Sequence, residues 1–235
     1  MQRVAQCCGK ATEVSSNPFA ARFVIAALLL TCTLGTLTVA TARWASGADT
    51  EQMVTAALAM ASSSRGGMSD AQRDGAASMM RPMLQFYPVT TSIGMLLFLL
   101  VISTVLYGAL TMVDAGLRWP IVFGASTYAA LAQTVAGLAL TAVLSAARPP
   151  TAAQLVDNSF LSTNLAGVLP ESTGPVLLAA ARSLDALSLV YLMVFVAMLG
   201  SYGKAKVSES TIGVVVGVCF VIWLVIRMGY AALFG

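Results

Sequence analysis

Charge is scarce in this 235-residue chain, and histidine is absent. Only 10% of the residues are charged, whereas a soluble domain has about 25%. The lack of histidine excludes haem or chlorophyll held by imidazole, His-ligated zinc or copper, and Ser-His or Cys-His catalysis. The four cysteines form neither a zinc-ribbon pattern nor a disulfide framework. Because P-loop, CxxC and HExxH motifs are also missing, we expect a protein without enzymatic activity, cofactor or metal.

Apolar residues dominate instead, at 58% of the chain, with a mean hydropathy of +0.83. A chain of this composition cannot cover itself with polar groups, so we expect lipid to be its solvent; bound lipid fits this expectation. Crossing the hydrocarbon core takes about 20 helical residues. Five apolar runs reach this length, namely 23–42, 89–113, 121–144, 184–202 and 211–234. The predicted fold class is all-α, a polytopic membrane bundle of five transmembrane helices.

The placement of lysine and arginine predicts the orientation of this bundle. With residues 1–22 in the cytoplasm, about 35 inner residues carry as many basic side chains as the outer loops 43–88 and 145–183, which total about 80. Positive charge is therefore about twice as dense inside, which favours the N-terminus inside and the C-terminus outside. Residues 23–235 then form one membrane domain. The net charge of +3 is scattered, so we expect no nucleic-acid binding.

The first outer loop is expected to contain two short amphipathic helices. In the first, methionines and alanines fall at i, i+3, i+4 and i+7, and the second opens at Ser69 and ends near Pro82. Flexible methionine side chains adapt to varied surfaces, so these helices are a candidate partner face; lying on the membrane or capping the bundle are the alternatives. The face comprises Met53, Met60, Met79, Met80 and Met83.

Two charged residues lie near the predicted outer ends of neighbouring spans, Asp185 and Arg227. Each is 18 residues from the short turn between these spans, which places both about 27 Å from it. Charge inside a membrane is costly unless it is paired. We therefore predict an ion pair between Asp185 and Arg227, as a structural latch or, alternatively, as part of a proton relay.

Small residues mark the positions where helices are expected to approach closely. Gly213 and Gly217 form a GxxxG motif in the last span, and Gly124 and Gly137 stand beside alanines in the third. In a five-span chain such residues seat neighbouring helices of the same chain more often than a dimer partner.

Several segments from the second span onward resemble a known family. The segments that carry the resemblance are Tyr107-Gly108-Ala109-Leu110, the turn 114–120, Tyr128-Ala129-Ala130-Leu131, the 184–191 entry to the fourth span, Leu199-Gly200-Ser201-Tyr202 with Lys204, and 222–234. Over roughly residues 45–235 this pattern resembles bacterial Yip1-domain proteins. The Asp-Leu-Tyr-Gly-Pro motif of eukaryotic members is absent, which argues against a trafficking role.

The resemblance implies a non-catalytic scaffold or accessory subunit in the bacterial inner membrane. Its expected partners are membrane lipids and other integral membrane proteins, such as an ABC-type exporter. The alternative is a transporter or permease subunit for a small or lipidic substrate, although the spans show neither proline breaks nor an internal repeat. A third reading is a small structural subunit of a respiratory or photosynthetic complex.

Overall fold

The computed structural model describes residues 18–65, 69–156, 159–161, 163–165, 169, 173–202 and 204–234. Most of the predicted segment 1–22 therefore lies outside the described residues. The described chain is helical, with one isolated bridge between Asn164 and Asp185. The elements are α2 (Ala21–Ser46), α3 (Thr50–Arg65), α4 (Asp70–Gln85), α5 (Tyr87–Met112), α6 (Trp119–Ala147), α7 (Ala152–Val156), the 3-10 helix η1 (Ser159–Leu161), α8 (Pro175–Ser183), α9 (Ala186–Tyr202) and α10 (Glu209–Phe234).

Four helices in the described chain are long and apolar enough to cross a membrane. They are Ala21–Ser46, Val89–Met112, Trp119–Ala147 and Glu209–Leu233. The fifth apolar run forms α9, which has 17 residues and a length of about 25 Å. The helices form despite many β-branched residues, because a segment in hydrocarbon must satisfy its backbone hydrogen bonds internally. The architecture thus fits an all-α integral membrane protein.

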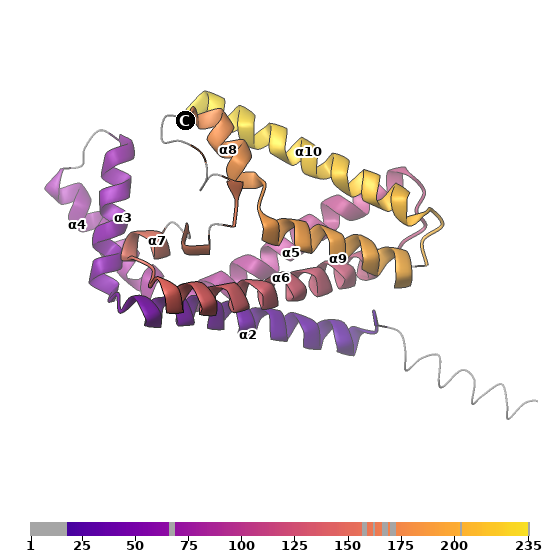
Figure 1. Ribbon diagram of the computed structural model, residues 1–235, viewed down its shortest axis with the longest axis horizontal. Coiled ribbons are helices and arrows are strands. Elements are labelled where there is room, and N and C mark those ends of the chain that lie inside the picture. Colours follow the sequence, from indigo (N-terminus) through magenta and orange to yellow (C-terminus); the bar gives the residue numbers. More distant parts are fainter. Residues whose placement is uncertain are drawn as a thin grey trace, which may run out of the picture.

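Helix α6 occupies the centre of the bundle and packs against α2, α9 and α5 (Figure 1). Its buried positions are almost all small, including Gly124, Ala125, Ala129 and Gly137. Small side chains let neighbouring backbones approach closely, which is how helices associate when no hydrophobic effect drives them together.

Buried threonines repeat every seven residues on the two helices that pack most closely. Thr31 and Thr38 lie on α2, and Thr127, Thr134 and Thr141 lie on α6. Each hydroxyl donates to the carbonyl four residues earlier in its own helix, at 2.7–2.9 Å. A spacing of seven keeps one face of a helix toward its neighbour, as in left-handed packing. These hydroxyls are therefore satisfied locally and do not bridge the helices.

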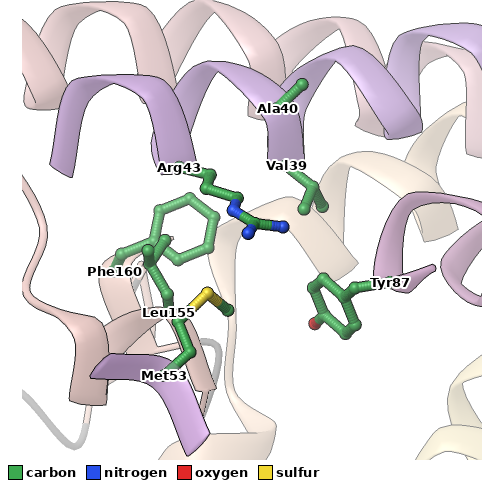
Figure 2. A pocket seen from close by; sticks show the side chains of 7 residues that line it. All are labelled: Val39, Ala40, Arg43, Met53, Tyr87, Leu155 and Phe160. Carbon is green, nitrogen blue, oxygen red and sulfur yellow. The ribbon is translucent and has the colours of Figure 1, made fainter. Parts of the chain in front are cut away.

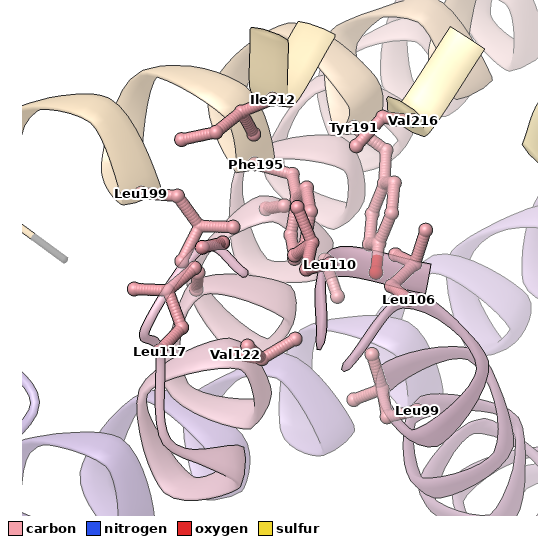
Figure 3. Close-up of a cluster of buried hydrophobic side chains, with 14 residues drawn as sticks. Leu99, Leu106, Leu110, Leu117, Val122, Tyr191, Phe195, Leu199, Ile212 and Val216 are labelled. Carbon is pink, nitrogen blue, oxygen red and sulfur yellow. The ribbon is translucent and has the colours of Figure 1, made fainter. Parts of the chain in front are cut away.

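The main apolar core lies where α5, α6, α9 and α10 meet (Figure 3). Leu99, Leu110, Phe195, Leu199 and Ile212 are almost completely buried there. Large apolar side chains are exposed along the outer faces of α2, α5 and α10. A soluble protein would not expose apolar surface on this scale, whereas lipid contact stabilises it.

The two ends of the bundle differ. Helices α3, α4 and α7 lie at one end, which we call the hairpin end because α3 and α4 run side by side. The short loops 113–118 and 204–208 lie at the other end, which we call the loop end. At the loop end the Lys206 amide donates to the Ala115 carbonyl at 2.9 Å, which joins the two short loops. At the hairpin end α3, α4 and α7 each begin with a capping box. The side chain of the residue before the helix accepts from the backbone amide of a glutamine three residues later, and the glutamine side chain accepts from the backbone amide of that first residue.

Candidate functional site

The interior of the bundle buries no charged side chain in the part of the chain that the structure describes. The buried polar groups there are serine and threonine hydroxyls and the hydroxyl of Tyr191. The same residues include no cluster of three histidine, cysteine, aspartate or glutamate side chains that could hold a metal ion. The functional surface is therefore expected on the outside of the molecule and at its two ends.

The predicted ion pair between Asp185 and Arg227 does not form: the ion pairs among the described residues are Arg81–Glu51 and Lys206–Asp114. The Asp185 carboxylate instead accepts hydrogen bonds from the Thr163 hydroxyl and from the Leu187 amide. The Arg227 guanidinium lies 6.0 Å from the centre of the Trp223 ring on its own helix. Asp185 thus caps the start of α9, and its carboxylate is committed to amide and hydroxyl donors.

The four glycines predicted to seat helices fall into two pairs. Gly124 and Gly137 are buried in α6, and a Cβ at Gly124 would come within 2.7 Å of the Phe19 ring and 3.2 Å of Val24. An added Cβ at Gly213 would lie 3.9 Å from Val196 of α9, which is ordinary contact, and one at Gly217 would meet nothing within 4 Å. Gly124 therefore permits the close crossing of α2 and α6, whereas in the GxxxG motif of α10 Gly213 lies beside α9 and Gly217 faces open space.

The five methionines of the predicted partner face do not share one surface. Met53 is 2% exposed and packs with Ala42 and Leu155, so it is unavailable to a partner and the prediction is wrong at this residue. Met60 and Met80 are half-buried. Met79 and Met83 remain exposed, at 71% and 62%. The exposed part of the face therefore belongs to α4 alone.

Helices α3 and α4 form a hairpin that a charged pair holds together. Arg81 donates from Nε to Glu51 Oε1 at 2.7 Å and from Nη2 to Oε2 at 2.9 Å. This hydrogen bonding lowers the pKa of Glu51 from its ordinary value of 4.5 and raises that of Arg81. Both side chains are exposed, so the pair fixes the geometry of the hairpin more than it stabilises the fold.

Arg43, in the last turn of α2, attaches this hairpin to the bundle. Its guanidinium donates to the Thr50 hydroxyl of α3 at 2.7 Å and to the Leu84 carbonyl of α4 at 3.4 Å. Figure 2 shows the guanidinium between Tyr87 on one side and an apolar wall on the other. The enclosed space measures only about 20 Å³, enough for one water molecule. This place is a structural joint and is too small for a ligand.

Sequence reasoning missed Arg43 as the anchor of the hairpin, although one signal was available. Arg43 follows the first apolar run directly, on the side where positive charge is sparse. An arginine that departs from the charge rule at the end of a span is a candidate for a specific contact. Its favourable position at a helix C-terminus adds a second reason, because cations stabilise that end.

An exposed apolar stripe joins the hairpin to the membrane-spanning surface. Met79 and Met83 on α4 are followed by Phe86, and then by Val89 and Ile93 on α5, at intervals of three or four residues. All five side chains are more than half exposed. Residues three or four apart lie on one face within a helix, so Met79 and Met83 share a face of α4 and Val89 and Ile93 share a face of α5, with Phe86 at the junction between the two helices. We take this stripe as the candidate interaction site.

Comparison with protein-family models, with curated proteins and with solved structures gives no match to this chain.

Proposed function

We propose that this chain is a non-catalytic integral membrane protein that serves as a scaffold or accessory subunit of a larger membrane complex. The observation that carries the proposal is the exposed stripe from Met79 to Ile93. Lipid covers the part of such a stripe that lies on α5, but α4 is a largely polar helix that is not among the candidate spans. Exposed methionines there are stabilised when a second protein covers them.

A partner that covers the whole stripe must itself lie partly in the membrane. It would contact α5 within the bilayer and α4 outside it, which describes another integral membrane protein. The resemblance to bacterial Yip1-domain proteins supports the same role, with an ABC-type exporter or another complex of the bacterial inner membrane as partner. The locally satisfied threonines of α2 and α6 also favour this role over transport, because a transport path needs polar groups that face one another.

The proposal includes five spans, with α9 as the shortest. Helix α9 is about 5 Å shorter than the hydrocarbon core, a mismatch that local thinning of the bilayer can accommodate. With five spans and the denser positive charge inside, the hairpin end lies outside and the loop end, with Lys204 and Lys206, lies inside. The two termini then lie on opposite sides of the membrane, whereas four spans would place them on the same side. Accessibility of single cysteines near each terminus to an impermeant thiol reagent distinguishes these topologies.

Co-purification of the tagged chain tests the functional proposal. The full chain is extracted in mild detergent, sized on a native gel and analysed by mass spectrometry for stoichiometric chains. We expect an integral membrane partner that is lost from the double variant Met79→Gln/Met83→Gln. Ser78→Gln is the matched control, because Ser78 is exposed on the same helix about 100° around from Met79. A chain that purifies without a partner, or a partner that the double variant retains, would contradict the proposal.

A further inference from the structure

An open groove separates α9 and α10 near the loop end of the bundle. The groove has a volume of about 430 Å³ and is open along its length; it is lined by Leu192, Met193, Val196, Glu209, Gly213, Val216 and Gly217. The groove exists because Gly213 and Gly217 carry no side chains that would fill it: a Cβ at Gly217 would meet nothing within 4 Å. Apart from Glu209, its walls are apolar and turn toward the surface that the membrane covers.

The length of the groove along α10 matches the hydrocarbon thickness of one leaflet of a bilayer. Glu209 and Gly217 are eight residues apart, which corresponds to about 12 Å along α10. Half of the hydrocarbon core is about 15 Å. One turn beyond Gly217, the next position on this face is not a glycine but Val221, whose side chain is exposed. A GxxxG motif also suits a helix of a second copy, but the carboxylate at one end of this groove favours a lipid with a cationic headgroup.

A carboxylate stands at the mouth of the groove, at the level where lipid headgroups lie. The stem of Glu209 packs on Gly200 of α9, where an added Cβ would come within 2.8 Å of Glu209 Cγ. Gly200 therefore allows the Glu209 side chain to lie between the two helices. The ion pairs of the described chain involve other residues, and Glu209 lies in the first turn of α10, where the helix dipole favours a negative charge. A primary ammonium group is the complement of this carboxylate, both in charge and in hydrogen-bond donors.

We propose that this groove binds one phospholipid with an ethanolamine headgroup. One acyl chain lies between α9 and α10 over Gly213 and Gly217, and the ammonium group donates to the Glu209 carboxylate. The inference rests on the membrane-spanning arrangement of the proposed function, but not on any protein partner. It therefore stands or falls separately from the co-purification experiment.

Native mass spectrometry of the full chain tests this site. The chain is released from nanodiscs that contain equal amounts of phosphatidylethanolamine, phosphatidylcholine and phosphatidylglycerol with identical acyl chains. We expect one retained phosphatidylethanolamine per chain. Gly217→Leu fills the groove and should abolish this retention, whereas Gly229→Leu on the same helix should leave it unchanged. The two variants are matched, because an added Cβ at either glycine would meet no neighbour within 4 Å. Glu209→Gln should lower the preference for ethanolamine over choline by about tenfold, as expected for a lost charge-assisted hydrogen bond.

Three results would overturn the proposal. Equal retention in Gly217→Leu and Gly229→Leu would place the lipid elsewhere on the bundle. An unchanged headgroup preference in Glu209→Gln would remove the role of the carboxylate. A dimer in the same spectra that only Gly217→Leu disrupts would show that a second copy fills the groove instead. Thermal unfolding of each variant in detergent verifies that a lost lipid does not reflect a lost fold.

Discussion

Replacement of Gly124 by alanine tests the packing at the centre of the bundle. The added Cβ would lie 2.7 Å from Phe19 Cδ1 and 3.2 Å from Val24 Cγ2, well inside ordinary contact distances. Phe19 precedes α2 by two residues, and Val24 lies in the first turn of α2. Helix α2 packs more extensively on α6 than on any other helix. The substitution therefore forces apart the two helices that form the largest contact of the fold.

Two opposing effects determine how much Gly124→Ala changes the free energy of unfolding. An extra methyl group in a well-packed interior costs about 1–3 kcal/mol. Alanine also favours a helix over glycine by about 1 kcal/mol, which offsets part of this cost. Gly108→Ala isolates the second term, because Gly108 lies on the exposed face of α5 and its Cβ would meet nothing within 4 Å. We expect Gly124→Ala to be less stable than Gly108→Ala by about 1–3 kcal/mol.

Unfolding of the purified full chain in mixed micelles measures this difference. Helix content is followed by circular dichroism while the fraction of denaturing detergent rises, and the two variants are compared with the unaltered chain. We expect Gly108→Ala to shift the midpoint slightly upward and Gly124→Ala to shift it downward. Equal midpoints for the two variants would refute the close crossing of α2 and α6 at Gly124.

Three further predictions use the same chain. Asp185→Ala should destabilise it by about 1 kcal/mol through loss of the helix cap, while Asp185→Asn should be nearly neutral; an equal loss in both, measured by unfolding, would favour an ion pair over a cap. Met53→Ala should cost about 2–5 kcal/mol through the cavity it leaves, whereas Met79→Ala should leave the unfolding midpoint unchanged. Because Arg81 lowers the pKa of Glu51 in the folded hairpin, the pair stabilises the hairpin fully above pH 4.5, and this stabilisation is lost as the pH falls through the lowered pKa. Spin-label distances between α3 and α4 should then broaden at low pH in the unaltered chain but show no such change in Glu51→Gln.

The positions of the long helices could be predicted because a membrane imposes simple constraints. The run 89–113 corresponds to Val89–Met112, and the run 211–234 to a helix that begins two residues earlier, at Glu209. The run 121–144 is shorter than its helix, Trp119–Ala147, at both ends. Hydropathy measures only the part of a helix in hydrocarbon, whereas the helix itself continues into the interface. The ends of the helices therefore could not be predicted from apolar length alone.

The surface of the hairpin could be predicted only in part, because burial depends on segments far away in the chain. Met53 and Met79 look alike in the sequence, since both are methionines on short polar helices. Met53 is buried because Leu155, about a hundred residues later, packs on it together with Ala42. No periodicity within the loop contains this information. The exposed stripe, by contrast, was partly visible as the cluster of Met79 and Met83, and its continuation onto α5 needed the structure.

The pairing of Asp185 with Arg227 shows how far a one-dimensional argument reaches. A rise of about 1.5 Å per residue fixes the height of a side chain along a helix, but each residue also turns the helix by about 100°. Equal height is thus necessary for an ion pair and far from sufficient. Asp185 also precedes the first turn of α9, where aspartate is among the preferred residues for the amide hydrogen bonds of a helix start. A carboxylate that is already hydrogen-bonded by the Leu187 amide and the Thr163 hydroxyl gains little from an arginine. The capping pattern at the start of α9 is therefore a stronger guide to the role of Asp185 than its equal height with Arg227.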